Sequence, residues 1–278
     1  MNMSRMFLIG MLLLLGARGA SSDGDAGPRL YVFDCGMLRF DSLDGFSIAN
    51  DETDVRDVIV PCYVIKHKGK HMLWDGGLPS KTAEVAGWQG EGMQARLDRT
   101  LAEQLPGIGL DMNSFDYAVY SHAHFDHVGV ANEVVGATLI IQQAEYDALF
   151  NSESALLAVD LSLVESLRNA DRIVINGDHD VFGDGRVRII STPGHTPGHQ
   201  SLLIDLENAG PIILSGDLYH FPISRSDRRV PTFNYDPEET LASMDRMEKL
   251  VEETGATFWI EHELALFETL KKAPAYYD

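Results

Sequence analysis

The sequence is poor in basic residues and in cysteine. Its 278 residues include 22 lysines and arginines against 42 aspartates and glutamates, which gives a formal net charge of −20. Because such a chain repels phosphate backbones, nucleic acid is not an expected partner. The two cysteines, Cys35 and Cys62, lack the CxxC spacing of redox and zinc motifs. They are expected either to pair under oxidising conditions or to lie as buried thiols on neighbouring strands.

Long apolar runs are absent after the first 20 residues. Residues 1–20 contain Arg5, an apolar stretch at residues 6–15 and the small residues Ala17, Gly19 and Ala20, a pattern typical of a secretory signal. The stretch is shorter than a bilayer span of about 20 residues, which makes an uncleaved anchor the weaker alternative. We therefore expect a periplasmic or secreted protein without stable membrane association after removal of the signal.

The rest of the chain lacks repeats, low-complexity segments and Ser- or Pro-rich linkers, so residues 21–278 are expected to form a single domain. Strand and helix patterns interleave in both halves, which favours sheets covered by helices. Strands are predicted at residues 30–35, 58–66, 71–75, 117–120, 137–141, 172–175, 186–191, 201–206, 211–214 and 257–260. Helices are predicted at residues 94–104, 142–150, 162–169, 237–253 and 264–272. Pro61 indicates an edge position or a bulge.

The densest group of potential metal ligands is SHAHFDHVG at residues 121–129. His122 and His124 are two residues apart, so they project to one side of an extended segment, whereas Asp126 and His127 require the chain to turn. A strand end that becomes a loop meets both conditions. Three imidazoles and a carboxylate already provide four donors of the kinds that zinc accepts, which favours a site for two ions over a site for one.

Further potential ligands follow three other predicted strands. His199 comes after residues 186–191 and a turn, Asp217 follows residues 211–214, and His262 follows residues 257–260. Loops at one edge of a sheet scaffold commonly converge on a functional site. This recurrence argues against the alternative of a chance histidine cluster on a solvated loop. Four other histidines lie in or beside turns and are not expected to bind metal: His67, His71, His179 and His195.

Together these motifs resemble the metallo-β-lactamase superfamily over almost the whole mature chain. The resemblance is carried by SHAHFDH, by STPGHTPGHQS around His199, by SGD around Asp217, and by His262. Within the superfamily, TPGHTPGHQSL at residues 192–202 and the Asp75-Gly76-Gly77 turn are most similar to the N-acyl homoserine lactonases, which are quorum-quenching enzymes. The superfamily resemblance implies an α+β fold, a four-layer αβ/βα sandwich with helices outside two facing sheets.

The resemblance also implies two divalent metal ions, usually zinc. It assigns His122, His124 and His199 to one metal, Asp126, His127 and His262 to the other, and Asp217 as the bridge beside a hydroxide. Two dications next to a shared water lower the pKa of that water and make it a nucleophile near neutral pH. In a lactonase this hydroxide attacks the lactone carbonyl, Asp126 shuttles the proton, and the product is the ring-opened acyl homoserine.

One position departs from the lactonase pattern. Many of these enzymes place a tyrosine three residues after the bridging aspartate, where it helps to bind the substrate carbonyl; here that residue is His220, preceded by Tyr219. Both are candidates for that contact, and an imidazole can donate a hydrogen bond to a developing oxyanion. Candidates for contact with an acyl tail, which core packing explains equally well, are Met37, Leu38, Phe40, Trp88, Met93, Phe221, Ile223 and Phe233.

Several related activities remain as alternatives to lactone hydrolysis. Glyoxalase II-like thioester hydrolases keep the bridging aspartate, but this chain has only Lys271 and Lys272 as basic residues near its end. Zinc β-lactamases usually have cysteine or serine where Asp217 stands, the net charge disfavours nucleases, and His124 disfavours di-iron oxygen-reducing relatives. A metal-binding or interaction protein on the same scaffold is the non-enzymatic alternative. The pattern does not predict the oligomeric state.

Overall fold

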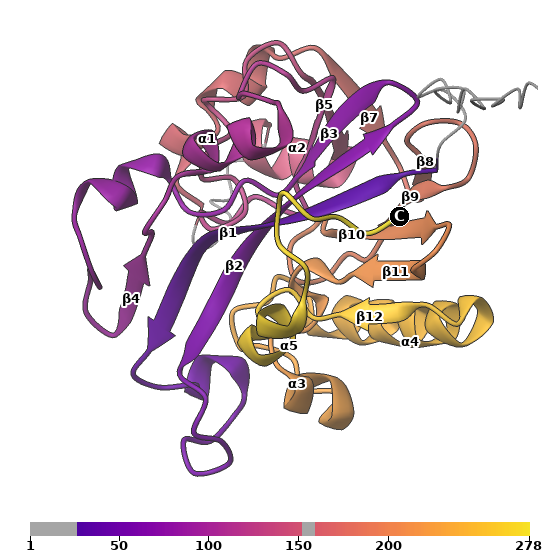
Figure 1. Cartoon of the computed structure of the whole chain (residues 1–278). Coiled ribbons are helices and arrows are strands. Elements are labelled where there is room, and N and C mark those ends of the chain that lie inside the picture. The colour runs from indigo at the N-terminus through magenta and orange to yellow at the C-terminus, as the bar shows by residue number, and fades with distance from the viewer. Residues whose placement is uncertain (1–26, 152–158) are drawn as a thin grey trace, which may run out of the picture.

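The computed structural model describes residues 27–151 and 159–278 and contains two β-sheets (Figure 1). The first has seven strands in the order β4-β1-β2-β3-β5-β6-β7. Their bounds are β1 Arg29–Phe40, β2 Asp57–His67, β3 Lys70–Trp74, β4 Met93–Arg96, β5 Tyr117–Val119, β6 Thr138–Gln142 and β7 Arg172–Ile175. The second has five strands in the order β12-β11-β10-β9-β8. Their bounds are β8 His179–Asp180, β9 Val187–Ser191, β10 Gln200–Leu206, β11 Gly210–Leu214 and β12 Thr257–Trp259.

The α-helices of the described residues are α1 Leu101–Gln104, α2 Gln143–Phe150, α3 Pro222–Asp227, α4 Pro237–Thr254 and α5 Leu264–Thr269. Short 3-10 turns occur at Asp44–Phe46, Ser80–Glu84, Leu105–Ile108, Leu161–Leu163, Glu165–Asn169 and Gly216–Leu218. Helix α4 begins as predicted, because the Asp236 carboxylate accepts the backbone N–H groups of Glu238 and Glu239. Within the described residues, each helix is too short or too polar to cross a bilayer, and the predicted signal at residues 1–20 lies outside them.

Alternate side chains of the strands point to opposite faces, and this alternation builds the layers. Tyr63 points between the sheets, where it shares an apolar cluster with Leu202 of the second sheet, whereas its neighbour Val64 belongs to the cluster on the outer face. On the second sheet, Leu203 points outward and packs in one cluster with Met247 of α4. Helices therefore cover the outer faces of two facing sheets, and the predicted αβ/βα sandwich is confirmed.

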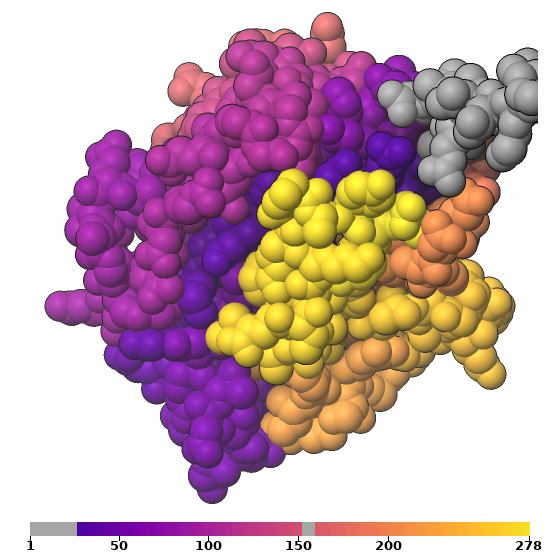
Figure 2. Space-filling view, in the orientation of Figure 1, coloured from indigo at the N-terminus to yellow at the C-terminus, as the bar shows by residue number. Residues whose placement is uncertain are grey.

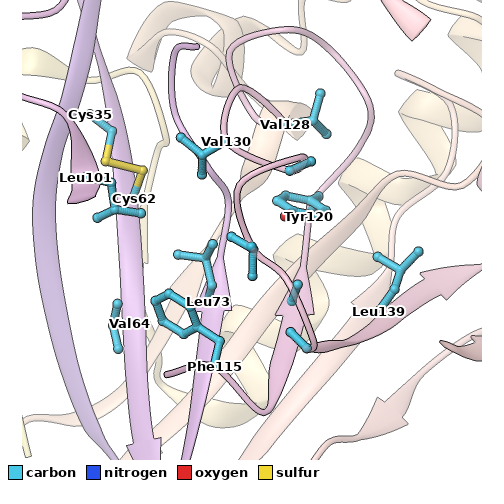
Figure 3. Close-up of a cluster of buried hydrophobic side chains, with 14 of the residues drawn as sticks. Cys35, Cys62, Val64, Leu73, Leu101, Phe115, Tyr120, Val128, Val130 and Leu139 are labelled. Carbon is cyan, nitrogen blue, oxygen red and sulfur yellow. A yellow bond between two sulfur atoms is a disulfide. The ribbon is translucent and has the colours of Figure 1, made fainter. Parts of the chain in front are cut away.

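The cluster on the outer face of the first sheet reaches the segment that follows the histidine motif (Figure 3). Cys35 of β1 and Cys62 of β2 form a disulfide in this cluster, which decides between the two possibilities that the sequence leaves open. A Cβ on Gly77 would lie 2.3 Å from the Cβ of Cys35, so only glycine fits there. The carbonyl of Gly77 accepts the N–H of Gly129 at 2.9 Å, so the disulfide region supports the end of the motif.

The predicted helix at residues 94–104 is only partly correct. Residues 93–96 form β4 instead and pair with β1, with Leu38 opposite Ala95. The chain turns back before them at Gly90 and Gly92, both of which have positive φ angles. The segment therefore forms a strand, because backbone hydrogen bonds to the edge of β1 stabilise it more than its approximate helical periodicity stabilises a helix. Only α1 remains helical, and the predicted helix at residues 162–169 is reduced to two 3-10 turns.

Pro61 occupies an interior strand, so the edge alternative is wrong. A bulge is present next to it, with its extra residue on the partner strand β1. Strand β2 lies between β1 and β3. Pro61 is paired with Asp34, and the register shifts between Asp34 and Met37 on the partner strand. The irregularity accommodates a residue that has no N–H to donate to the ladder.

The C-terminal segment after α5 runs beside the first half of β1, at the edge of the first sheet that β4 leaves unpaired. Tyr277 forms an isolated bridge with Leu30, and the N–H of Ala273 donates to the carbonyl of Val32 at 2.9 Å. Figure 2 shows the C-terminal end of the chain in yellow, next to the indigo N-terminal part and the orange residues of the second half. The opposite ends of the described chain are therefore in contact.

Candidate metal centre

Four loops that follow strands bring histidines and aspartates to one edge of the sandwich. The motif at residues 121–127 follows β5, the loop with His195 follows β9, Asp217 lies in the 3-10 turn after β11, and His262 follows β12. The ligand candidates in these loops are almost fully buried, with exposed fractions of 9% or less. The loops come from both sheets, β5 from the first and β9, β11 and β12 from the second, and their histidines and aspartates form two compact groups.

The first group of donor atoms comes from three imidazoles and one carboxylate. His122 Nε2 lies 2.8 Å from His124 Nδ1, and His195 Nε2 lies 3.2 Å and 3.0 Å from those two nitrogens. Asp217 Oδ2 is 3.3 Å from His195 Nε2 and 3.6 Å from His122 Nε2. Tetrahedral ligands at zinc–nitrogen distances are about 3.3 Å apart, so the spacing of this group suits a single ion.

A second group surrounds the other oxygen of Asp217. Oδ1 lies 3.0 Å from His262 Nε2 and 3.2 Å from His127 Nε2. Asp126 Oδ2 is 3.8 Å and 3.7 Å from the same two nitrogens. Two of these buried atoms, Asp217 Oδ1 and His127 Nε2, have no hydrogen-bond partner among the described residues. One carboxylate thus faces two donor groups, which is the arrangement required of a bridging ligand.

Partners of the remaining ring nitrogens orient the imidazoles. The pairs are His127 Nδ1 with Asp75 Oδ2 at 3.0 Å, His195 Nδ1 with Asn234 Oδ1 at 2.9 Å, and His262 Nδ1 with the Ile59 carbonyl at 2.7 Å. Such contacts fix the tautomer and leave Nε2 available as a ligand. Sequence reasoning missed Asn234, because no motif or spacing connects it with His195, and it treated Asp75 only as part of a turn.

The two groups differ in their electrostatics. Burial lowers the pKa values of His122 and His124 well below the usual range. Burial acts in the same direction on His262, but Asp217 and Asp126 outweigh it and raise its pKa to about 9. His122 and His124 are therefore neutral and offer lone pairs directly, whereas His262 loses a proton when it becomes a metal ligand.

His195, and not His199, belongs to the first group, which corrects the sequence prediction for both residues. Nδ1 of His199 lies 2.9 Å from the Thr192 carbonyl, and its Nε2 accepts the backbone N–H of Asp217 at 2.9 Å. Both nitrogens of His199 are thus occupied, Nδ1 by a contact within its own loop and Nε2 by the backbone of Asp217. The TPGHTPGHQ segment offers two histidines in the same local context, and only the path of the loop distinguishes them.

Tyr219 and His220 point in opposite directions. Tyr219 packs in the cluster beneath α4, and its hydroxyl donates to Glu248 Oε1 at 3.0 Å. His220 Nε2 lies 3.0 Å from Asp217 Oδ2, and its ring stacks on that of His262 at 5.7 Å between centroids. The structure therefore excludes Tyr219 from contact with a ligand at this centre and places His220 beside it.

An apolar cavity of about 320 Å³ opens onto the centre. It is lined by Leu38, Phe40, Ser42, Gly45, Phe46, Val58, Met93, His124, Phe125, Asp126, Asp217, His220, Phe221, Phe233 and His262. Of the predicted tail contacts, Met37, Trp88 and Ile223 are absent from this lining. Trp88 instead packs under the guanidinium of Arg39 at 4.3 Å. Sequence reasoning missed Phe46 and Phe125, which carry no distinguishing local pattern.

The donor set fits two divalent cations. Neutral imidazoles and carboxylates are ligands of zinc and of related divalent metals. The first group is His122, His124 and His195 with Asp217, and the second is Asp126, His127 and His262 with Asp217. Unpartnered Asp217 Oδ1 and His127 Nε2, both buried, gain a partner when a cation is present. The arrangement is capable of metal-assisted attack on a substrate held in the adjoining cavity.

Comparison with known protein families agrees with this geometry. The family model for the metallo-beta-lactamase superfamily matches residues 55–255. N-acyl homoserine lactonase AttM of Azorhizobium caulinodans is 28% identical over 263 residues, which cover 90% of this chain and 98% of that protein. An N-acyl homoserine lactonase from a Bacillus species is 29% identical over 257 residues, covering 89% and 98% of the two chains.

Solved structures show the same fold. A structure of N-acyl homoserine lactone hydrolase with the product N-hexanoyl-L-homoserine at the catalytic metal centre has a TM-score of 0.76 and 25% identity, and covers 90% of this chain and 99% of that one. Bacillus thuringiensis AiiA with N-decanoyl-L-homoserine bound also has a TM-score of 0.76, with 24% identity and the same coverage.

Proposed function

The chain belongs to the metallo-beta-lactamase superfamily, and from this premise we propose that it is a metal-dependent hydrolase that opens the lactone ring of N-acyl homoserine lactones. The observation that carries the proposal is the pair of donor groups joined by Asp217 at the wall of an apolar cavity. The curated lactonase relatives, matched over 90% of this chain, support the same substrate class.

The cavity suits a substrate with a small polar ring and an apolar tail. Its wall next to the centre is formed by His124, Asp126 and His220, whereas the remainder is mostly aromatic and aliphatic. A lactone placed against the polar wall leaves its acyl chain against Phe46 and Phe233. Burial of each methylene there is worth about 0.8 kcal/mol.

The chain's own residues orient the reactants and move the proton. Two divalent ions, which we propose to be zinc, would be held by the two donor groups and would supply Lewis acidity to the reaction. Asp126 lines the cavity, so its carboxylate is placed to accept the proton of the attacking water and to pass it to the ring oxygen. The bond between the carbonyl carbon and the ring oxygen breaks, and the products are a carboxylate, an alcohol and one released proton.

Base titration of the released acid tests the proposed function. Metal-loaded protein is assayed in parallel with an N-acyl homoserine lactone, a glutathione thioester and a β-lactam. We expect the lactone to be hydrolysed fastest and the activity to disappear after removal of metal by a chelator. Faster hydrolysis of the thioester would contradict the proposal and indicate a glyoxalase II-like activity. Faster hydrolysis of the β-lactam would contradict it and indicate a β-lactamase-like activity.

His220 is proposed to donate a hydrogen bond to the substrate carbonyl, and replacement by phenylalanine tests this role. His220→Phe keeps an aromatic ring on His262 but removes the N–H, so we expect lactone turnover to fall by about a hundredfold. Tyr219→Phe is the matched control, because it introduces the same residue at the neighbouring position. It removes only the hydrogen bond from the tyrosine hydroxyl to Glu248. Its turnover should stay within about twofold of wild type. Equal losses in the two variants would contradict the role given to His220.

We also propose that the protein acts outside the cytoplasm. The apolar N-terminal stretch and the disulfide between Cys35 and Cys62 both support this location, since disulfides persist in oxidising compartments. Fractionation of cells that express the full chain tests it, with the periplasm or the medium as the expected location and the cytoplasm as the contrary result.

A further inference from the structure

Glu145 is a buried carboxylate outside both donor groups. It is the third residue of α2, which follows β6, and its exposed fraction is 3%. Its Oε1 accepts the backbone N–H of Ala123 at 2.9 Å, and its Oε2 accepts the backbone N–H of Gly198, also at 2.9 Å. A single side chain thus hydrogen-bonds two loops that are 75 residues apart in the sequence.

Both N–H groups belong to loops that supply donors of the first group. Ala123 stands between His122 and His124, and Gly198 lies three residues after His195. The carboxylate of Glu145 therefore fixes the separation of the two backbone segments that carry these imidazoles. Because the ring nitrogens converge within about 3 Å, a small shift of either loop changes the spacing of the group.

The start of α2 lies so close to Gly198 that a residue with a side chain does not fit at this position. A Cβ on Gly198 would lie 2.5 Å from both the Cβ and the backbone nitrogen of Glu145, and 2.9 Å from the Cβ of Gln142. The loop of His195 therefore lies directly on the start of α2. Burial raises the pKa of Glu145, and the side chain of Thr196 and the N–H groups of Gly198 and Ala123 oppose this rise without cancelling it.

We propose that Glu145 is a positioning residue that sets the metal affinity of the first donor group by holding the loops of residues 121–127 and 192–199 together. The inference rests on the metal centre and not on the identity of the substrate. Its test therefore uses metal binding alone, so a failure of the lactonase proposal and a failure of this one are distinguishable.

Glu145→Gln tests the proposal, because the amide has the same shape but presents an NH₂ group to one of the two N–H donors. Stepwise zinc binding is measured by competition with a chromophoric chelator on the full chain. We expect one of the two zinc equivalents to bind about tenfold more weakly or worse, as is typical when a group that orients ligands is lost. The other equivalent should keep its wild-type affinity.

Glu133→Gln is the control, because it removes the same charge from an exposed glutamate whose Oε2 accepts a hydrogen bond from Ser80. The urea midpoint of the metal-free protein is measured for each variant. A lower midpoint for Glu145→Gln with both zinc affinities unchanged would overturn the proposal, because it would show a purely structural role. If Glu145→Gln does not fold, the same titration is made on Glu145→Asp, where weaker binding of one equivalent supports the proposal and unchanged binding of both overturns it.

Discussion

Replacement of Asp217 by asparagine should reduce lactone turnover by about a thousandfold, equivalent to about 4 kcal/mol of transition-state stabilisation. Asp217 is the only described side chain that places one oxygen against each donor group, with Oδ2 toward His195 and Oδ1 toward His262. Asparagine keeps the volume but supplies only one oxygen and no charge. The two ions would then repel each other without the carboxylate between them.

Metal content and turnover of Asp217→Asn are measured on the same sample, by elemental analysis and base titration. Asp205→Asn serves as the control, because Asp205 is exposed and lies on β10 away from the four loops. We expect the control to retain two metal equivalents and full turnover. Retention of both metals with turnover within tenfold of wild type in Asp217→Asn would show that the carboxylate is not the bridge.

The second large effect is expected at His195. His195→Gln removes one of the four donors of the first group, and a structural zinc site worth about 12 kcal/mol implies roughly 3 kcal/mol for each of four ligands, or about a hundredfold in affinity. One zinc equivalent should therefore bind about a hundredfold more weakly, and turnover should fall with it. The second equivalent, held by His127 and His262, should be unaffected.

His199→Gln provides a matched comparison for His195→Gln. Glutamine can still accept the N–H of Asp217 and donate to the Thr192 carbonyl, the two contacts that His199 makes. We expect this variant to bind two zinc equivalents with affinities near those of wild type. Loss of one equivalent in His199→Gln, with normal binding in His195→Gln, would restore the ligand assignment suggested by the sequence.

The sequence predicts the metal centre well where a ligand directly follows a strand. His122, Asp217 and His262 come immediately or almost immediately after β5, β11 and β12, so an apolar run before each of them places it at the sheet edge. His195 and His199 are different, because a loop with two Pro-Gly pairs separates β9 from β10. The fold of that loop depends on contacts with α2 and α4, such as Gly194 against Thr240, which no local pattern contains.

Tyr219 and His220 show a second limit of the same kind. Tyr219 has extended backbone angles, with φ −140° and ψ 135°, so consecutive side chains point to opposite sides. The sequence does not specify which side faces the cavity. The packing of Tyr219 beneath α4 decides this, and it depends on the position of a helix that begins 18 residues later.

Diffraction from zinc-loaded crystals at the zinc absorption edge tests the metal centre most directly. The account predicts two anomalous peaks, one about 2.0–2.2 Å from donor atoms of His122, His124 and His195, the other at the same distance from Asp126, His127 and His262, with Asp217 between them. A single peak, or a peak coordinated by His199 with His195 unbound, would contradict it.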